Sequence, residues 1–229
     1  MKKIIPNHVV IIPDGNRRWA RKNGLKSFQG VLSGGNYNHL KSLFDEAKEA
    51  GIKYVSLWGF STENWRRPKI EINSVFSLIL SNFERFRADL AKDKTRFRHF
   101  GRKDRLPKKL LEAISILEKE SKNFKDFNIQ LCLDYGGRDE IVRAVNNIIK
   151  DKKKKVDEKE FAKYLDNAEV PDVDLIIRTS GEKRTSGLMP FQSVYAELYF
   201  CDKYFPDFSA EDMKDAIEEF SRRKRNFGK

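Results

Sequence analysis

The sequence has few of the residues that build disulfide-stabilised or zinc-dependent proteins. Its 229 residues include two cysteines, Cys132 and Cys201, and three scattered histidines. Both cysteines lie in apolar segments and no CxxC pair is present, which argues against a disulfide framework and a structural zinc site. This cysteine usage fits a reducing compartment, and we expect a cytoplasmic protein.

Long hydrophobic runs are missing as well. No apolar stretch approaches the roughly 20 residues that a membrane-spanning helix needs. The start of the chain contains two lysines and a short β-branched run, without the small-residue cleavage site of a signal peptide. The sequence nevertheless holds 17 Phe, 7 Tyr and 3 Trp, which a disordered protein would not. Its length suits one folded domain over residues 1–229.

Positive charge is abundant. The chain carries 46 Lys and Arg against 34 Asp and Glu, a formal net charge of +12. This excess predicts an anionic partner, and nucleic acid, phosphorylated metabolites and an anionic membrane surface all qualify. The lysine-rich run at residues 150–155 is typical of a solvated helix end or loop, so it explains part of the excess without a partner.

Strand and helix patterns alternate along the whole chain. Apolar runs predict six strands, at residues 8–13, 52–60, 96–100, 127–135, 173–178 and 194–200. Helical spacing and caps predict helices at residues 17–23, 37–50, 72–90, 107–121, 139–150, 158–165 and 210–225. This order predicts an α/β fold, with a mostly parallel sheet of about six strands flanked by helices.

Chemically distinctive residues follow four of these strands, where ligands bind in parallel sheets. The first group is Asp14-Gly15-Asn16-Arg17-Arg18, a turn that leads into a helix. Helix N-termini and arginines bind phosphate, and Gly15 lets the backbone approach closely. Asp14 would repel phosphate unless a divalent cation such as Mg²⁺ lies between them. The alternative is that Asp14 only caps the helix.

The loops after two other strands mix cations with other side chains. Phe60 and Trp65 lie close to Arg67 in the sequence, which suits an apolar chain with an anionic head; the alternative is a Trp that only anchors the loop. Arg178 and Arg184, six residues apart, suit a diphosphate clamp, or else belong to a flexible basic loop.

Glu197 stands inside the last apolar strand run. A carboxylate there is costly unless it is paired or binds a metal. Glu197 is therefore a candidate second metal ligand beside Asp14, and a buried Glu–Arg pair is the competing explanation.

Taken together, these segments resemble the cis-prenyltransferases, the undecaprenyl diphosphate synthase family. The matching segments are HVVIIPDGNRRWA (8–20), WGFSTENWRRP (58–68), DYGGRDEIV (134–142), VDLIIRTSGEKRTSG (173–187), QSVYAELYF (192–200) and FPDF (205–208). The resemblance implies that isopentenyl diphosphate is added to an allylic diphosphate such as farnesyl diphosphate, giving an undecaprenyl-like polyprenyl diphosphate. It also implies Mg²⁺, a homodimer and an apolar substrate tunnel. Apolar residues of 40–44, 52–60 and 72–90 are candidates for its wall, or for ordinary core.

The resemblance assigns roles to residues at matching positions. Asp14 and Glu197 match the carboxylates tied to the metal, and Asn16 matches a residue proposed to assist proton removal. The candidate catalytic residues are Asp14, Asn16, Ser61 and Asn64. The candidate substrate-binding residues are Gly15, Arg17, Arg18, Trp19, Phe60, Trp65, Arg67, Glu71, Arg178, Arg184 and Ser186.

Three positions depart from the family pattern. Ser27 and Val31 stand where many members have Arg and His near the allylic diphosphate, and Asn226 stands in place of a C-terminal Arg. These departures motivate an alternative, a non-catalytic prenyltransferase-like subunit that binds a partner enzyme or a lipid. Nucleic-acid binding is not expected, because no RRM, KH or OB signature is present. Contact with a membrane surface stays open.

Overall fold

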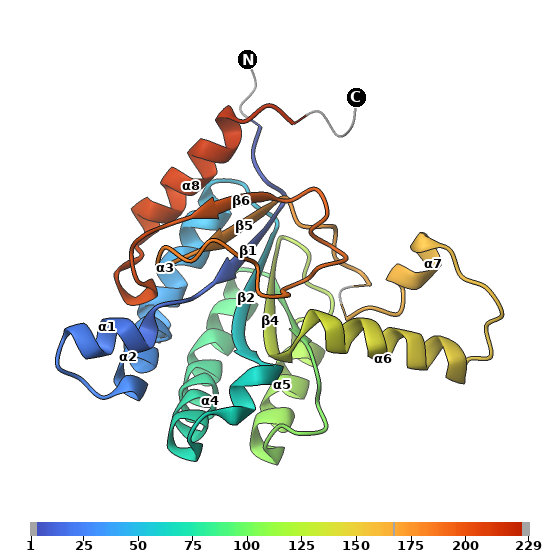
Figure 1. Ribbon diagram of the computed structural model, residues 1–229, viewed down its shortest axis with the longest axis horizontal. Helices are drawn as coiled ribbons and strands as arrows, with labels where there is room; N and C mark the ends of the chain where they lie inside the picture. The colour runs from blue at the N-terminus through green and yellow to red at the C-terminus, as the bar shows by residue number, and fades with distance from the viewer. Residues whose placement is uncertain (1–3, 167, 226–229) are drawn as a thin grey trace.

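The computed structural model describes residues 4–166 and 168–225, built around one six-stranded sheet (Figure 1). The strand order is β3-β4-β2-β1-β5-β6, and every neighbouring pair is parallel. The strands are β1 (His8–Ile12), β2 (Tyr54–Ser61), β3 (Thr95–Phe100), β4 (Phe127–Tyr135), β5 (Leu175–Arg178) and β6 (Glu197–Phe200). The predicted α/β class and all six strands are confirmed. Because all strands are parallel, the loops after β1, β2, β4 and β5 emerge at one edge of the sheet.

The α-helices also follow the prediction, with α2 as an addition, and two short 3-10 helices join them. The α-helices are α1 (Asn16–Lys22), α2 (Ser27–Gly34), α3 (Tyr37–Glu49), α4 (Lys69–Lys92), α5 (Lys108–Glu120), α6 (Gly137–Lys150), α7 (Glu158–Ala162) and α8 (Ala210–Arg222), and the 3-10 helices are η1 (Thr62–Arg66) and η2 (Phe205–Asp207).

Helix α2 was not predicted, because its two glycines lower the intrinsic helix propensity. Packing explains why it forms. A Cβ on Gly30 would lie 1.9 Å from the backbone oxygen of Asn16, so only glycine allows α2 to pack this closely on α1.

Both faces of the sheet are covered. In β1, Val9 and Ile11 point into a large cluster that includes residues of α3, α4, α5 and α8. Val10 and Ile12 point into a smaller cluster on the other face, with Leu188 and other residues that follow β5. Coverage on both sides explains why every residue of β1 and β4 is buried, as expected for a parallel sheet.

The cysteines and histidines serve the fold. Cys132 is buried in β4 and Cys201 is half-buried after β6, and neither is in a disulfide. Nε2 of His8 lies 2.9 Å from Oγ of Ser56, and Nε2 of His99 lies 2.9 Å from the carbonyl oxygen of Leu133. The predicted absence of a disulfide framework is confirmed for these two cysteines.

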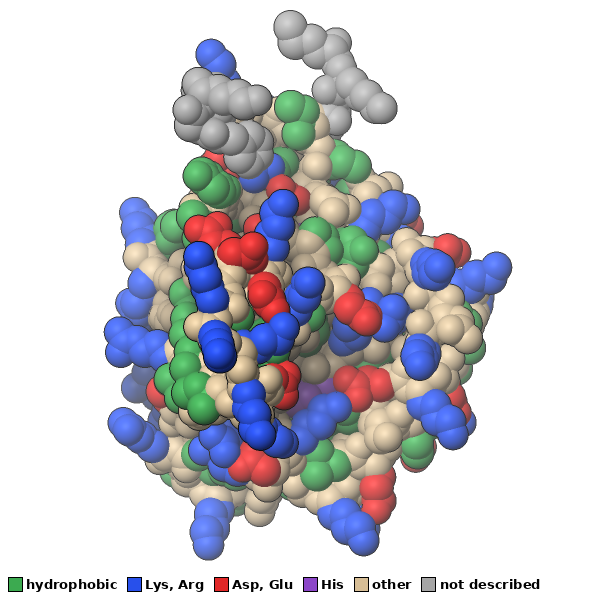
Figure 2. Space-filling view, turned by 90° about the vertical axis from the view of Figure 1, so that its right-hand side faces the viewer, with side chains coloured by type: hydrophobic (Ala, Val, Ile, Leu, Met, Phe, Trp, Pro, Cys, Tyr) green, Lys and Arg blue, Asp and Glu red, His purple; other side chains and the backbone are tan. Residues whose placement is uncertain are grey.

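On the face formed by α6 and α7, basic and acidic side chains are interspersed (Figure 2). Figure 2 shows Lys and Arg side chains scattered across the α6 and α7 side of the molecule, with acidic side chains between them. The lysine-rich run follows the end of α6 at Lys150 and is exposed through Lys155, which confirms a solvated helix end. None of the helices within residues 4–166 and 168–225 has the length and apolar character to cross a bilayer.

Candidate active site

The turn after β1 is built by Asp14 and Gly15. Gly15 has φ +93°, in the left-handed region that costs other residues about 1–2 kcal/mol. A Cβ here would lie 2.6 Å from Cδ1 of Tyr204 and 2.7 Å from Cβ of Ser180. Gly15 is itself the N-cap of α1, and its N–H donates to Oδ1 of Asp14 at 2.6 Å. The capping interpretation of Asp14 is therefore wrong, and its carboxylate is available for other contacts.

Two arginines neutralise Asp14. Nη2 of Arg178 donates to Oδ2 of Asp14 at 2.8 Å, and Nη2 of Arg18 lies 3.5 Å from Oδ1. Burial by itself would raise the pKa of Asp14, but the hydrogen bonds from Arg178 and the Gly15 N–H, together with both arginine charges, hold that pKa below its ordinary value. Asp14 is thus a carboxylate at neutral pH.

Arg178 organises the predicted diphosphate clamp. Its side chain is nearly buried, and Nη1 donates to Oγ of Ser186 at 2.7 Å and to the carbonyl oxygen of Arg184 at 2.6 Å. One guanidinium therefore fixes the loop after β5 against the turn after β1. The flexible-loop alternative does not describe this segment, because its contacts are specific.

A residue outside the predicted site, Glu182, connects the two groups that are predicted to bind phosphate. Its Oε1 accepts from Nη1 of Arg18 at 2.7 Å, and its Oε2 accepts from Nη1 of Arg184. The Arg184 hydrogen bond lowers the pKa of Glu182. The feature of the sequence that could have identified Glu182 is its position as a lone carboxylate inside the basic run RTSGEKR.

These residues surround the charged part of a cavity of about 630 Å³. The polar lining includes Asp14, Gly15, Asn16, Arg17, Arg18, Arg21, Asn64, Arg67, Glu182 and Arg184. Oδ1 of Asn16 is buried without a hydrogen-bond partner, although Nδ2 of the same side chain donates to the carbonyl oxygen of Pro13 at 2.8 Å. The cavity therefore offers several cations and two carboxylates, those of Asp14 and Glu182.

The rest of the cavity is apolar and long. Its walls include Leu40, Phe44, Leu57, Gly59, Val75, Leu78, Ile79, Phe83, Phe86, Leu90, Phe97, Leu117, Ile129 and Leu131. Val75 and Leu90 belong to the same helix, α4, and 15 residues of helix span about 22 Å. The residues at 40–44, 52–60 and 72–90 thus divide between wall and core, since Ile72 and Phe76 are buried core residues outside the lining.

The loop after β2 places two of its predicted site residues in the wall of the cavity. Asn64 and Arg67 line the cavity. Burial, followed by the charge of Arg17, lowers the pKa of Arg67 within its strongly basic range. Within the described part of the chain, no carboxylate reaches ion-pair distance of Arg67. A cation so placed favours a bound anion.

Three neighbours of these residues lie behind the cavity wall. Phe60 is buried against Trp65 and Phe76, with ring centroids 5.3 and 5.1 Å away. The N–H of Ser61 donates to Oδ1 of Asn64 at 3.2 Å at the start of η1. Phe60, Ser61 and Trp65 are outside the lining, so they support the loop, and the interpretation of Trp65 as a loop anchor describes the structure.

Trp19 and Glu71 have contacts of other kinds. Nε1 of Trp19 donates to Oδ1 of Asp207 at 2.7 Å, which ties α1 to η2 outside the cavity lining. Oε2 of Glu71 lies 3.8 Å from Nε of Arg17. Trp19 therefore holds the site in place rather than lining it, and Glu71 approaches the site through Arg17.

Glu197 is not beside Asp14. It pairs in register with Leu175 at the start of β5, whereas Arg178 at the end of β5 pairs with Ile12, just before Asp14. Its Oε2 accepts from Nη1 of Arg223 at 2.8 Å, on a half-buried surface. The predicted two-carboxylate metal site is wrong for a single chain, and the competing Glu–Arg pair is what forms.

Asp14 by itself offers too few ligands for Mg²⁺, so the phosphates of a bound substrate would have to supply others. Among the described residues, no group of three His, Cys, Asp or Glu side chains gathers as a metal site. Mg²⁺ commonly binds one or two carboxylates and completes its ligands with phosphates and water. The ionised, partly exposed Asp14 at a cavity rich in arginine fits that pattern.

The positions that depart from the family pattern lie at the cavity too. Ser27 and Val31 line it, so the cations near this wall come from Arg17, Arg18 and Arg21 of α1. Asn226 lies outside the described residues. The neighbouring Arg225 donates from Nη1 to Oδ1 of Asp174 at 2.8 Å.

Known proteins resemble this chain over nearly its whole length. Residues 12–228 match the family model described as "Putative undecaprenyl diphosphate synthase". The chain is 44% identical to an isoprenyl transferase of Aquifex pyrophilus, covering 98% of this chain and 96% of the relative. It is 43% identical to the isoprenyl transferase of Fusobacterium nucleatum, covering 100% and 98%.

Two solved structures share the fold of this chain. The lavandulyl diphosphate synthase of Lavandula x intermedia, in complex with dimethylallyl diphosphate, superposes with a TM-score of 0.93 at 33% identity, covering 98% of this chain and 99% of that one. A probable undecaprenyl diphosphate synthase of Campylobacter jejuni gives 0.81 at 33% identity, with the same coverage. Since the family model matches residues 12–228 and these relatives match nearly the whole chain, this chain belongs to the undecaprenyl diphosphate synthase family of isoprenyl transferases.

Proposed function

We propose that this isoprenyl transferase condenses isopentenyl diphosphate with an allylic diphosphate, such as farnesyl diphosphate, and elongates it with cis double bonds to an undecaprenyl-like diphosphate. The observation that carries the proposal is the cavity, which has arginines and Asp14 in one part and a long apolar wall along α4 in the rest. Its shape and chemistry fit a hydrocarbon chain with a diphosphate head.

The charged part of the cavity divides into two groups. Gly15, Arg17 and Arg18, at the start of α1, are suited to the allylic diphosphate. Arg184, with Arg178 and Ser186 behind it, is suited to the diphosphate of isopentenyl diphosphate. Asn16 also lines the cavity and, as the resemblance implies, would assist removal of a proton from the isopentenyl unit.

Charge stabilisation is the main task of the protein in this reaction. The allylic carbon–oxygen bond breaks as diphosphate leaves, and the isopentenyl double bond attacks the resulting carbocation, so no protein nucleophile is required. Arg18 and Arg67 stabilise the negative charge on the leaving group. Mg²⁺ held by Asp14 and the diphosphates would add Lewis-acid stabilisation of the same charge.

A direct assay tests this proposal. The purified chain alone, given farnesyl diphosphate, radiolabelled isopentenyl diphosphate and Mg²⁺, is expected to make long prenyl products, and EDTA is expected to stop the reaction. Chromatography of the dephosphorylated product gives its length. Absence of turnover, with restoration by a second protein, would favour the non-catalytic subunit that Ser27 and Val31 suggest.

A homodimer remains our proposal for the assembly. Val194 and Tyr195 are 71% and 65% exposed, and Leu198 of the edge strand β6 is also exposed. An apolar group of this kind next to an open strand edge suits a subunit interface. A cytoplasmic location, peripheral contact with a membrane surface and the absence of nucleic-acid binding stay predictions.

A further inference from the structure

A buried carboxylate lies directly behind the loop that carries Asn64 and Arg67. Asp134, near the end of β4, has a fully buried side chain and φ +52°. Nε1 of Trp65 in η1 donates to its Oδ1 at 2.8 Å, a contact between residues 69 positions apart. We infer that Asp134, with Arg105, is a positioning residue for this loop, an inference that rests on the proposed function for what the loop does.

Arg105 completes the contact from the loop between β3 and α5. Its Nε donates to Oδ2 of Asp134 at 2.8 Å, and its Nη2 donates to Oδ1. Its guanidinium carbon also lies 5.5 Å from the centre of the Trp65 ring. The fork satisfies the buried charge of Asp134 and covers the indole, so carboxylate, guanidinium and indole form one unit.

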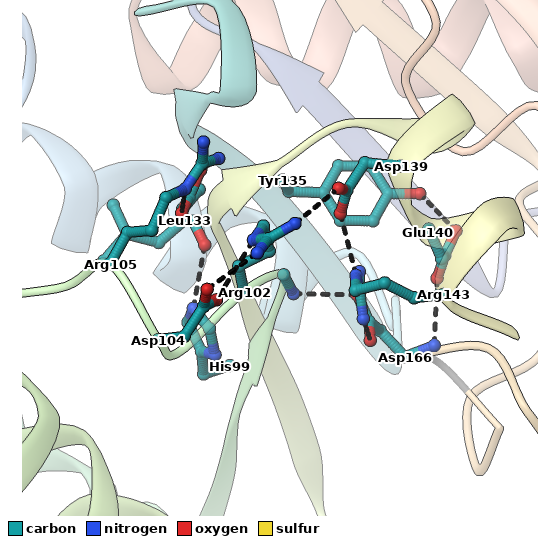
Figure 3. Close-up of polar contacts among 12 residues, drawn as sticks. His99, Arg102, Asp104, Arg105, Leu133, Tyr135, Asp139, Glu140, Arg143 and Asp166 are labelled. Carbon is teal, nitrogen blue, oxygen red and sulfur yellow. Dashed lines mark hydrogen bonds and ion pairs between the residues drawn. The ribbon is translucent and has the colours of Figure 1, made fainter. Parts of the chain in front are cut away.

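The loop that supplies Arg105 is itself held in place (Figure 3). The Arg102 N–H donates to the carbonyl oxygen of Asp134 at 3.1 Å, and Nη1 of Arg102 donates to Oδ1 of Asp139 at 3.1 Å. Asp139 in turn accepts from Nε of Arg143 at 2.8 Å. This network anchors the Arg105 loop to α6, so Arg105 and Asp134 present a fixed surface to Trp65.

This network holds Trp65 in place, and Trp65 in turn positions its neighbours at the cavity. Phe60 and Phe76 fix the plane of the Trp65 ring, and the N–H bond to Asp134 fixes how far the ring reaches inward. Asn64 and Arg67, within two residues of Trp65, line the cavity. A displacement of about 1 Å at such residues can cost about 100-fold in rate.

Trp65→Phe and Arg105→Lys test the inference. Phe keeps an aromatic ring, although a smaller one, and removes the N–H donor, whereas Lys keeps the charge but removes the fork. We expect each variant to lower kcat by about 10- to 100-fold, while the midpoint of unfolding shows that the protein remains folded. Arg87→Lys is the matched control, because Arg87 makes a comparable fork to Glu120 on the exposed surface of α4 and α5. Its kcat should stay within about twofold of wild type.

A double-mutant cycle separates positioning from general stability. Asp134→Ala combined with Trp65→Phe should lose little more activity than the worse single variant, because Asp134→Ala removes the acceptor and Trp65→Phe removes the donor of the same hydrogen bond. If the losses multiply, or if Trp65→Phe keeps the wild-type kcat, Asp134 does not position the loop. Should Asp134→Ala fail to fold, Trp65→Phe and Arg105→Lys still decide the question.

A spectroscopic readout keeps this inference separate from the proposed reaction. The chain has three Trp, so ¹⁵N-labelled protein gives three indole N–H resonances, and the one absent from Trp65→Phe belongs to Trp65. Arg105→Lys should shift that resonance and speed its hydrogen exchange. An unchanged resonance would refute the contact even if the enzyme is active, whereas a wild-type protein without turnover would refute the proposed function alone.

Discussion

Arg178 and Asp14 join the ends of two neighbouring strands, with Nη2 of the arginine donating to Oδ2 of the aspartate at 2.8 Å. The register of β1 and β5, which pairs Ile12 with Arg178, brings these side chains together. The same contact holds the proposed metal-binding carboxylate in its ionised form. Removing or titrating Asp14 should therefore affect both chemistry and stability.

Asp14→Ala should abolish prenyl transfer. We expect incorporation of radiolabelled isopentenyl diphosphate to fall by at least about 100-fold, because the carboxylate that accommodates the metal and the diphosphates is lost. Circular dichroism should show an unchanged fold. Full activity in this variant would contradict the mechanism.

The stability contribution of Asp14 should depend on pH. Its folded-state pKa is depressed, so its stabilising effect is present above the unfolded value near 3.8 and is lost as the pH falls through the lower folded-state value. Asp14→Asn should therefore lower the free energy of unfolding by about 1–3 kcal/mol at pH 7. Urea unfolding should show this difference shrinking below about pH 3.8. A difference that is the same at pH 7 and at pH 3 would be inconsistent with an ionised Asp14.

Glu182→Gln should strengthen the binding of pyrophosphate. In this structure Glu182 pairs with Arg18 and Arg184, so an incoming diphosphate competes with an internal carboxylate. Removing the charge should tighten Mg²⁺-pyrophosphate binding by about two- to fivefold, as measured by calorimetry at constant ionic strength. Glu120→Gln, which breaks a surface pair with Arg87, is the control and should bind as wild type. Weaker binding by Glu182→Gln would mean that Glu182 orients the arginines instead of competing for them.

Gly15→Ala should lower the free energy of unfolding by more than the left-handed backbone conformation alone would. Gly24 has φ +68°, and a Cβ added there would meet no atom within 4 Å, so Gly24→Ala isolates the left-handed penalty of about 1–2 kcal/mol. Gly15→Ala adds the contacts with Tyr204 and Ser180 and should be less stable and inactive. Chemical denaturation of both variants provides the comparison. Equal losses would show that the turn can move away from Tyr204.

Ile79→Trp should shorten the product. Ile79 lines the apolar part of the cavity on α4, and a larger ring there reduces the space for a growing chain. Chromatography of the dephosphorylated products should show fewer isoprene units than wild type. Ile116→Trp, at a 45% exposed position on α5, is the control and should leave the product length unchanged. Unchanged product lengths from Ile79→Trp would show that the growing prenyl chain does not pass Ile79.

Local patterns predicted the framework well, for reasons visible in particular elements. The run HVVII and the following Asp-Gly identified β1 and its turn, because β-branched runs and turn residues act over a few positions. Helix α2 escaped prediction, because its formation depends on how Gly30 contacts Asn16 of another helix. Glu197 was misplaced, because its position inside an apolar run does not reveal at which end of the sheet it lies.

The sequence by itself determined the order of the strands and of every α-helix except α2, the four loops that carry charge and the turn at Asp14, since these follow from spacing within short segments. Only the tertiary structure decided that Glu182 lies between Arg18 and Arg184, and that Trp65 faces Asp134 instead of the cavity. The physical reason is distance along the chain: the 69 residues between Trp65 and Asp134 leave no local pattern, and the parallel pairing of β2 with β4 brings them together.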